Sequence, residues 1–200
     1  MNKDIRLAKI SDSKAIVDIY KPFIENTTIT FEYEVPTVEE FESRMEEIQR
    51  IYPWFVAEID KKIVGYAYAS KYNKRAAYDW AVDFAIYIDP KYHRKGIGKG
   101  LYHALLNTLK LQGFNNAYAL VTSPNFKSEQ IHKALGFTEM GKAKNVGYKM
   151  GKWLDVTTFE LQFGEHVDNP AKPKCIYEVI NTEEYKKILR EARENISIEK

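Results

Sequence analysis

The stretch 83–106 constrains the fold of this chain most strongly. Residues 80–88 are mainly β-branched and aromatic, and they are followed by Pro90, which has no amide hydrogen to give to a sheet. Leucines recur at helical spacing from Gly98 onward, so the loop 91–97 leads directly into a helix N-terminus. The pattern therefore predicts a strand, a short loop and a helix.

The loop before this helix has the features of an anion-binding site. Backbone amides at a helix N-terminus point outward without intrahelical acceptors, and the helix dipole favours negative charge there. Gly96 and Gly98 lack a Cβ atom, which lets a bulky ligand lie against the backbone, and Arg94, Lys95 and Lys99 add positive charge. We expect a phosphate or pyrophosphate group to bind here.

Three nucleotide-binding motifs compete for this loop, and their spacing separates them. A Walker loop requires Ser or Thr after its Gly-Lys pair, but another glycine follows Gly98 and Lys99. The dinucleotide fingerprint would place its third glycine at Leu101. The remaining pattern, Gln/Arg-x-x-Gly-x-Gly/Ala, is that of the pyrophosphate loop of GNAT N-acetyltransferases. Residues 93–98 resemble it, with His93 in the place of Gln or Arg.

The composition describes one cytosolic domain. At 200 residues and 44% hydrophobic the chain can bury a full core, and it is too short for two ordinary domains. We find no apolar run long enough to span a bilayer and no signal-peptide segment, and a net charge of +2 gives no reason to expect nucleic acid. The single Cys175 excludes an internal disulfide, and the four scattered histidines show no metal-ligand spacing. We expect a cytoplasmic protein that binds no metal, membrane or nucleic acid.

The remaining segments predict a mixed α/β sheet with helices on its faces. The expected strands are residues 4–9, 54–59, 62–70, 80–88, 116–122, 140–149 and 153–163, and the expected helices follow Ser11 or Asp12, Thr37, Ile97 and Asn125. Thr37 and Glu40 form a capping-box pattern, and Gly65 marks a bulge or a close approach of strands. We expect the strand 116–122 to be buried on both faces, and Ile131 and Leu135 to face inward.

The composition changes after residue 165. Residues 168–174 contain two prolines and predict a linker, and residues 176–198 predict a charged amphipathic helix. We expect a main domain of residues 1–165 and a C-terminal extension of residues 166–200, which packs on the flank of the domain or on a partner subunit.

Over residues 4 to about 165 the chain resembles the phosphinothricin or methionine sulfoximine N-acetyltransferase branch of the GNAT superfamily. Beyond the loop 93–98, the resemblance is carried by Ile19-Tyr20, residues 25–31, residues 52–54, residues 77–80, Pro124-Asn125, Leu135-Gly136, residues 147–149, Trp153 and Asp155. It implies the GNAT fold, a mixed, mostly antiparallel sheet with a splayed central strand. It also implies transfer of acetyl from acetyl-CoA to the amino group of a small amino-acid-like molecule by direct attack, without a metal.

The resemblance places the catalytic base, usually a Glu on the central strand, at Asp83. Aspartate is shorter by about 1.5 Å, so its carboxylate can act through a water. Its pKa must also rise from near 4 to suit an amine of pKa about 8, and we expect burial beside Trp80 and Tyr87 to raise it. His132 occupies the place where GNAT enzymes often have a Tyr that protonates the leaving thiolate.

The resemblance also implies a cofactor site and a substrate site. The cofactor site comprises the backbone of Ile86, Tyr87 and Ile88 at the splayed strand end, the side chain of Asn125, and the loop residues His93, Arg94, Lys95, Gly96, Ile97, Gly98 and Lys99. The substrate candidates are Thr28, Phe31, Arg75 and Tyr78, followed by Tyr148 and Lys149. Arg75 suits a carboxylate or phosphinate because its planar guanidinium binds such groups with two hydrogen bonds. Family members form dimers, so we also expect a homodimer.

Two other functions stay open at this point. The first is an N-acetyltransferase for another amine, such as a protein N-terminus or a polyamine. A polyamine enzyme would need an acidic pocket, which the loop around Arg75 argues against. The second is a catalytically inactive coenzyme A-binding module, which the presence of Asp83 in the place of Glu allows.

Overall fold

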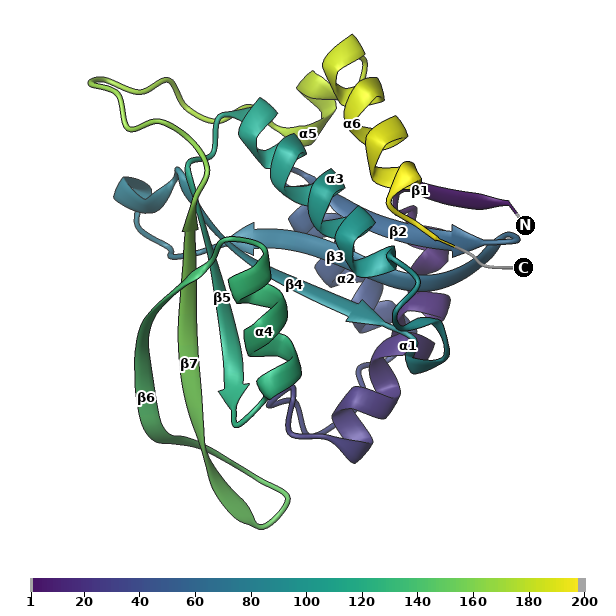
Figure 1. Ribbon diagram of the computed structural model, residues 1–200, viewed down its shortest axis with the longest axis vertical. Helices are drawn as coiled ribbons and strands as arrows, with labels where there is room; N and C mark the ends of the chain where they lie inside the picture. The colour runs from purple at the N-terminus through teal and green to yellow at the C-terminus, as the bar shows by residue number, and fades with distance from the viewer. Residues whose placement is uncertain (1, 198–200) are drawn as a thin grey trace.

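The computed structural model describes residues 2–197 and folds them around one seven-stranded sheet of order β1-β2-β3-β4-β5-β7-β6 (Figure 1). The strands are β1 (Lys3–Leu7), β2 (Trp54–Ile59), β3 (Lys62–Lys71), β4 (Ala81–Ile88), β5 (Asn116–Ser123), β6 (Thr138–Lys149) and β7 (Lys152–Gln162). The helices are α1 (Ser13–Asn26), α2 (Val38–Gln49), α3 (Ile97–Gln112), α4 (Phe126–Ala134), α5 (Ile176–Val179) and α6 (Glu183–Glu194). Among these residues no helix has the length and the apolar character that crossing a membrane requires.

The pairing of β4 with β5 sets the geometry of the sheet. All other neighbouring strands are antiparallel, whereas β4 and β5 run parallel. These two strands pair at only three positions, Ala81–Asn116, Val82–Ala117 and Asp83–Tyr118. They then separate, so residues 84–88 of β4 have no strand beside them on that edge. The expected mixed, mostly antiparallel sheet with a splayed central strand is confirmed.

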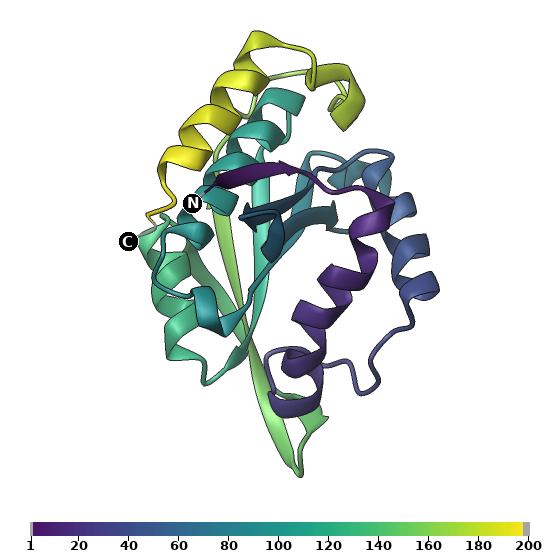
Figure 2. The ribbon, with the colours of Figure 1, turned by 90° about the vertical axis from the view of Figure 1, so that its right-hand side faces the viewer.

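Helices cover both faces of the sheet. Figure 2 shows α1 and α2 on one side and α3 with α6 on the other. On the α3 side, the leucines that recur at helical spacing are buried in one core with Val82 and Phe84 of β4. Successive strand residues point to opposite faces, so Asp83 lies on the α1–α2 side. That side is packed around aromatic rings, with Trp54 stacked on Tyr68 at a centroid distance of 4.1 Å.

Two local predictions are confirmed in detail. The capping box at the start of α2 is present: the Thr37 hydroxyl accepts from the amide of Glu40 at 3.1 Å, and the Glu40 carboxylate accepts from the amide of Thr37 at 2.9 Å. Gly65 lies opposite Ala57 where the β2–β3 register shifts, and a Cβ atom there would lie 3.1 Å from the carbonyl oxygen of Tyr87. Gly65 therefore marks both a bulge and a close approach of strands.

Two predictions about buried faces were wrong. Leu120 is 62% exposed and Asn116 and Tyr118 on the same face are half-buried, so this second face of β5 is buried only near its end, at Thr122. At α4 the expectation holds for Leu135, which packs partly buried against the core, but not for Ile131, which is 51% exposed. The inward-facing side chain there is His132, which is 5% exposed. Adjacent helix positions point about 100° apart, so placing His132 inward turns Ile131 toward solvent.

The C-terminal helix prediction was also wrong in one respect. Residues 176–198 contain two helices, α5 and α6, rather than one, and the predicted end at residue 198 lies outside the described residues. The second helix begins after Thr182, whose hydroxyl accepts from the amide of Tyr185 at 3.2 Å. This local cap gives α6 its own start.

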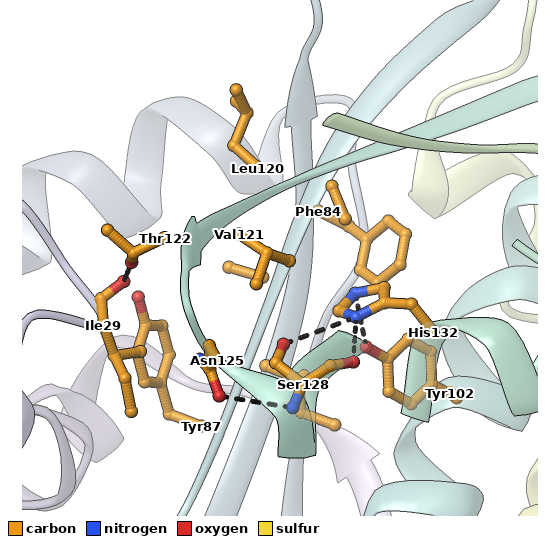
Figure 3. A pocket seen from close by; sticks show the side chains of 13 residues that line it. Ile29, Phe84, Tyr87, Tyr102, Leu120, Val121, Thr122, Asn125, Ser128 and His132 are labelled. Carbon is orange, nitrogen blue, oxygen red and sulfur yellow. Dashed lines mark hydrogen bonds between the residues drawn. The ribbon is translucent and has the colours of Figure 1, made fainter. Parts of the chain in front are cut away.

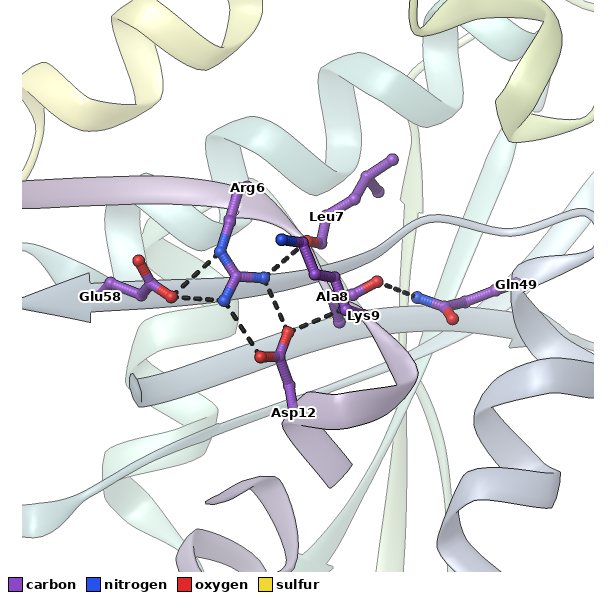
Figure 4. A network of polar contacts seen from close by, with 7 residues as sticks. All are labelled: Arg6, Leu7, Ala8, Lys9, Asp12, Gln49 and Glu58. Atoms are coloured by element: carbon purple, nitrogen blue, oxygen red, sulfur yellow. Dashed lines mark hydrogen bonds and ion pairs between the residues drawn. The ribbon is translucent and has the colours of Figure 1, made fainter. Parts of the chain in front are cut away.

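Arg6 of β1 joins three elements at the edge of the sheet (Figure 4). Its guanidinium donates to both carboxylate oxygens of Asp12, at 2.7 and 3.1 Å, and to the carboxylate of Glu58 in β2. It also donates to the carbonyl of Leu7 at 2.9 Å. Asp12 additionally accepts from the amide of Lys9 at 2.8 Å. Asp12 thus stands at the expected helix start, but its carboxylate serves this network instead of capping α1.

The charge of Asp12 contributes to stability in a defined pH range. Burial by itself would raise the pKa of Asp12, but the bonds from Arg6 and the Lys9 amide outweigh it, so the pKa lies below its usual value. A carboxylate with a lowered folded-state pKa stabilises the fold above the unfolded-state pKa. That contribution is lost as the pH falls through the folded-state pKa.

We expect Asp12→Asn to lower the free energy of unfolding at pH 7 by about 1.5–3 kcal/mol, the range for hydrogen bonds to charged groups. Urea unfolding of the wild type and the variant between pH 7 and pH 2.5 should show the difference shrinking at the acid end. Asp18→Asn is the matched control, because Asp18 forms an exposed pair with Lys14 on α1, and it should change stability by less than about 0.5 kcal/mol. A difference that stays constant with pH would contradict the role of the Asp12 charge.

Candidate active site

A cleft opens where β4 and β5 separate (Figure 3). It is lined by residues 84–87 of β4, residues 119–122 of β5, Tyr102, Asn125, Ser128, His132 and Ile29. Residues 84–88 have no neighbouring strand on this edge, so their backbone groups can pair with an extended chain that contains amides. The structure thus brings Ile86, Tyr87 and Asn125 of the predicted cofactor site to one cleft, with Ile88 at the next position of β4.

Asn125 has one half of its side chain engaged and the other half free. It occupies the N-cap of α4, where its Oδ1 accepts from the amide of Ser128 at 3.3 Å. Within residues 2–197 its side-chain amide hydrogens have no acceptor, so they are available to a carbonyl in the cleft.

The loop between β4 and α3 presents free backbone amides. In the described part of the chain, the N–H groups of residues 94–99 have no hydrogen-bond acceptor. The first helical bond of α3 is donated by Gly100 to the carbonyl of Gly96 at 2.9 Å. Arg94 and Gly96 have φ angles of 60° and 72°, and such left-handed residues gather successive amides into an anion-binding concavity. The loop therefore retains the donors that an anion requires.

The side chains of the loop contribute unequally. Arg94 and Lys99 are exposed and can reach an anion. The ammonium of Lys95 lies 5.1 Å from the ring centroid of Tyr92, a cation–π contact. Ile97 is 1% exposed, so it packs in the core and offers only its amide.

The predicted reason for Gly96 was wrong. A Cβ atom at Gly96 would lie 1.9 Å from the carbonyl oxygen of Asn195, so its open side faces the C-terminal extension rather than a ligand. A Cβ atom at Gly98 would lie 3.2 Å from Cδ1 of Ile88, the end of a flexible side chain. His93 is also engaged within the protein, because its Nε2 donates to the carbonyl of Ile88 at 3.1 Å. The loop thus offers a ligand its amides and exposed cations, whereas Gly96 serves internal packing.

Asp83 is the last residue of β4 that pairs with β5. Its carboxylate interacts electrostatically with Tyr118, its partner across the strand pair, and with Tyr68 of β3. Its Oδ1 atom is buried and has no hydrogen-bond partner among the described residues. Burial raises the pKa of Asp83 from 3.8 to about 7. A buried carboxylate without a partner is costly for stability and is typical of a catalytic group.

The prediction that Trp80 helps to bury Asp83 was wrong. The indole N–H of Trp80 donates to the carbonyl of Ala171 at 2.8 Å, so this side chain is directed toward the C-terminal extension. Tyr87 lies four positions further along β4 and packs edge-on against Tyr20 at a centroid distance of 4.7 Å. The neighbours of the carboxylate are tyrosines from β3 and β5 instead.

His132 lines the cleft with both ring nitrogens engaged (Figure 3). Nδ1 lies 2.7 Å from the carbonyl oxygen of Ser128, which can only accept, so Nδ1 carries the hydrogen. Nε2 lies 3.2 Å from the hydroxyl of Tyr102, and in the neutral ring it accepts from that hydroxyl. Burial lowers the pKa of His132, which keeps the ring neutral at pH 7. In this arrangement His132 has no free N–H for a ligand.

One pair of predicted substrate residues, Arg75 and Tyr78, lies in the loop after β3. The ring of Tyr78 packs edge-on against Tyr72 at 5.7 Å, and Tyr72 stacks on Tyr118 at 4.2 Å. Because Tyr118 pairs with Asp83, this loop lies beside the unpartnered carboxylate.

The other pair, Thr28 and Phe31, lies in the loop after α1. The hydroxyl of Thr122 in β5 holds this loop by donating to the carbonyl of Ile29 at 3.1 Å. The ring of Phe31 covers Gly147 of β6 so closely that a Cβ atom at that glycine would lie 2.2 Å from it. This pair therefore lies near the end of β5 opposite to Arg75 and Tyr78, with exposed Leu120 between them.

Of the further substrate candidates, Lys149 is used inside the protein. Its ammonium is buried and donates to the carbonyl of Thr30 at 2.8 Å, and burial lowers its pKa. The carbonyl of Tyr148 accepts from the hydroxyl of Tyr33. Both residues therefore join the β6–β7 hairpin to the loop after α1.

The tyrosines of the site were missed in the sequence. Tyr68 and Tyr118 lie beside Asp83, Tyr72 stacks on Tyr118, and Tyr102 contacts His132. Three of them come from β3, the loop after it and β5, so their proximity depends on strand pairing, which spacing along the chain does not reveal. Tyr102 had a usable signal, because it stands beside Leu101 on the buried face of a predicted helix.

Comparisons with known proteins identify the family. Residues 5–158 match the family model described as an acetyltransferase (GNAT) domain. The chain belongs to the GNAT acetyltransferase family. It is 37% identical over 173 residues to the phosphinothricin N-acetyltransferase of Streptomyces viridochromogenes. The aligned region covers 86% of this chain and 92% of that protein. It is 29% identical over 163 residues to an L-methionine sulfoximine/L-methionine sulfone acetyltransferase of Salmonella typhimurium, covering 81% of this chain and 95% of that protein.

A solved GNAT structure has the same fold. The crystal structure of a phosphinothricin acetyltransferase from Sinorhizobium meliloti in complex with acetyl-CoA matches with a TM-score of 0.80 and 31% identity. The match covers 88% of this chain and 99% of that chain. The prediction of an acetyl-CoA-dependent N-acetyltransferase with the GNAT fold is thereby confirmed.

The residues of this chain fit that cosubstrate. The free amides of residues 94–99 suit a diphosphate, and the unpaired edge of β4 suits the amides of a pantetheine arm. Within residues 2–197 no cluster of three or more His, Cys, Asp or Glu side chains could hold a metal ion.

Proposed function

We propose that this GNAT enzyme acetylates the amino group of a small amino acid or a close analogue, of the phosphinothricin or methionine sulfoximine type, with Asp83 as the base. The observation that carries the proposal is Asp83 itself: the residue is half-buried, and its Oδ1 is buried without a hydrogen-bond partner among residues 2–197, at the point where β4 and β5 separate. The names of the related proteins support the substrate class.

The raised pKa of Asp83 suits it to remove a proton from an amine. An ordinary Asp lies about four units below an amine of pKa about 8, which makes the transfer uphill by roughly 5 kcal/mol. With a pKa of about 7 for Asp83, the gap falls to one unit, or about 1.4 kcal/mol. Asp83 takes the proton as the amine attacks, directly or through one water.

Acetyl-CoA supplies the acetyl group as a thioester. The amides of residues 94–99 and the side chains of Arg94 and Lys99 are placed to hold its diphosphate, and the Asn125 amide is placed to donate to its pantetheine arm. The edge of β4 from residue 86 to residue 88 directs that arm toward Asp83. The role of His132 in protonating the departing thiolate stays a prediction, since its only N–H is already donated to Ser128.

We assign the binding of the substrate's acidic group to the loop after β3. Arg75 is exposed in this loop, close in sequence to Tyr78 and on the same side as Tyr118, the partner of Asp83. A guanidinium there can bind a carboxylate or phosphinate with two hydrogen bonds while the amine lies near Asp83. Thr28 and Phe31 flank the opposite end of β5 and limit the space available to the substrate there.

We also propose that the enzyme is a homodimer. β6 is an edge strand, and exposed apolar side chains gather along β6 and β7: Met140, Val146, Tyr148, Met150 and Trp153. A second copy that covers this hairpin would bury both the edge and the apolar surface. Sedimentation of the purified protein tests this, and a monomer at micromolar concentration would contradict it. The cytoplasmic location expected from the sequence stays a prediction.

A panel of amines tests the substrate class. Thiol release from acetyl-CoA should be fastest with methionine sulfoximine, methionine sulfone or phosphinothricin, and slow with polyamines and peptide N-termini. Arg75→Ala should raise KM for these amino acids by about 10- to 100-fold with little change in kcat, because it removes a charge-assisted pair. Lys74→Ala, in the same loop, is the control. Coenzyme A binding without turnover on any amine would favour the inactive-module alternative instead.

Asp83→Asn tests the base directly. We expect kcat to fall by about 10²- to 10⁴-fold, the usual contribution of a general base, while the Kd for acetyl-CoA stays unchanged. In the wild type, kcat/KM should rise with pH through about 7, the pKa of Asp83, and this limb should be absent in the variant. Asp79→Asn is a suitable control because Asp79 forms a partly exposed pair with Lys71 away from the β4–β5 separation. Unaltered turnover in Asp83→Asn would remove Asp83 from the mechanism.

Asp83→Asn should lower activity but raise stability at pH 8. The folded-state pKa of Asp83 is raised, so the stability that its neutral form confers is fully present below about pH 4 and is lost as the pH rises through about 7. Asp83→Asn should therefore unfold at higher urea concentration than the wild type at pH 8, with the difference shrinking toward pH 4. A variant that is inactive and also less stable at pH 8 would point to misfolding as the cause.

A further inference from the structure

The C-terminal extension packs along α3 and ends at the loop 93–98. Figures 1 and 2 both show α6 beside α3, with the end of the extension near the loop that precedes α3. Six side chains of the extension are buried in the same core as α3: Ile176, Val179, Tyr185, Leu189, Ala192 and Ile196. The extension is therefore integrated into the fold, although the match to the GNAT family model ends at residue 158.

Two glycines let the backbone of the extension touch the backbone of α3 and its loop. A Cβ atom at Gly96 would lie 1.9 Å from the carbonyl oxygen of Asn195, and one at Gly100 would lie 2.7 Å from that of Ala192. Real side chains do not approach backbone atoms so closely, so both positions require glycine while the extension is in place. The contact is thus main chain against main chain.

A hydrogen bond from Ser197 sets the direction of one peptide group in the loop. The amide of Ser197 donates to the carbonyl of Lys95 at 2.9 Å. That carbonyl and the N–H of Gly96 share one peptide plane, and in a trans peptide they point in opposite directions. Since the carbonyl is held toward the extension, the N–H of Gly96 points away from it, and it has no acceptor among residues 2–197. A flipped peptide would turn a carbonyl oxygen, rather than a donor, toward an anion.

The end of the extension is anchored independently of the loop. Arg193 forms an ion pair with Asp4 and donates to the carbonyl of Ile5 at 3.2 Å. The ammonium of Lys3 donates to the carbonyl of Ile196, whose side chain is 1% exposed. These contacts with β1 hold the backbone of residues 195–197 in place, so that it can act on the loop as a fixed support.

We propose that residues 195–197 are a positioning element for the cosubstrate: the Ser197 amide holds the Lys95–Gly96 peptide with its N–H directed at the diphosphate of acetyl-CoA. This inference rests on the proposed role of the loop 93–98 as the diphosphate site. Residues 195–197 are separate from Asp83 and the cleft between β4 and β5, so they act on the affinity for ligands that carry the diphosphate and not on acetyl transfer itself.

Ser197→Pro and Ser197→Ala separate the amide from the side chain. Ser197 is exposed, so neither change disturbs the core, but only proline removes the amide hydrogen. Calorimetry should show a Kd for coenzyme A about five- to tenfold higher in Ser197→Pro, the effect of one hydrogen bond, and within about twofold of wild type in Ser197→Ala. The value of kcat at saturating acetyl-CoA should be the same in all three proteins. Equal affinities in the proline and alanine variants would overturn the proposal.

A substrate without the diphosphate separates a specific effect on the loop from a general loss of structure. A general loss of structure would weaken the use of this substrate as well as that of acetyl-CoA. S-acetylpantetheine does not extend to the loop 93–98, so its KM should be the same in Ser197→Pro and in the wild type. Leu189→Ala, which removes a buried side chain of α6, should lower the melting temperature without changing the affinity for coenzyme A. A parallel loss for both thioesters in Ser197→Pro would show a merely structural role.

Gly98→Asp distinguishes this proposal from the function on which it rests. An added carboxylate at Gly98 would repel a diphosphate bound at the start of α3. If Gly98→Asp leaves coenzyme A affinity unchanged, the loop is not the diphosphate site and both proposals fail. If Gly98→Asp weakens binding while Ser197→Pro does not, the loop assignment holds and the role of the extension is excluded.

Discussion

The separation of β4 from β5 after Asp83 is the constraint on which the rest of the site depends. Parallel strands normally continue to pair along their length, but here pairing stops after three positions. The unpaired edge of β4 leaves backbone donors and acceptors that need partners, and an extended amide chain can provide them. The same separation opens the cleft from Phe84 onward, directly after Asp83, the last residue of β4 that pairs with β5. Cosubstrate binding and the position of the base therefore follow from one feature of the sheet.

The site is also the place where the fold accepts an energetic cost. Arg6 and Asp12 at the sheet edge satisfy each other, and their charges stabilise the structure. Among the described residues Oδ1 of Asp83 has no such partner, and the side chains with which its charge interacts are those of Tyr68 and Tyr118. Satisfied charges at the edge of the sheet and an unsatisfied one where β4 and β5 separate fit the general observation that enzymes give up stability where reactivity requires it.

The C-terminal extension changes how the glycine-containing loop should be understood. In the sequence Gly96 and Gly98 look equivalent, as two residues that make room for a ligand. In the structure Gly96 makes room for the main chain of Asn195, whereas Gly98 lies near the end of β4. The loop is therefore supported by the extension at Gly96, and the N–H groups of residues 94–99 keep no acceptor among the described residues.

The sequence by itself determined the order of strands and helices up to β7, the capping box of α2, the bulge at Gly65 and the loop with free amides at the start of α3. Each of these depends on periodicity or on residues a few positions apart, so it is encoded locally. Only the tertiary structure decided that His132 rather than Ile131 faces inward, that Leu120 is exposed, that tyrosines lie beside Asp83, and that Gly96 meets Asn195. These outcomes depend on which distant segments pack together, and spacing along the chain carries no direct signal of that.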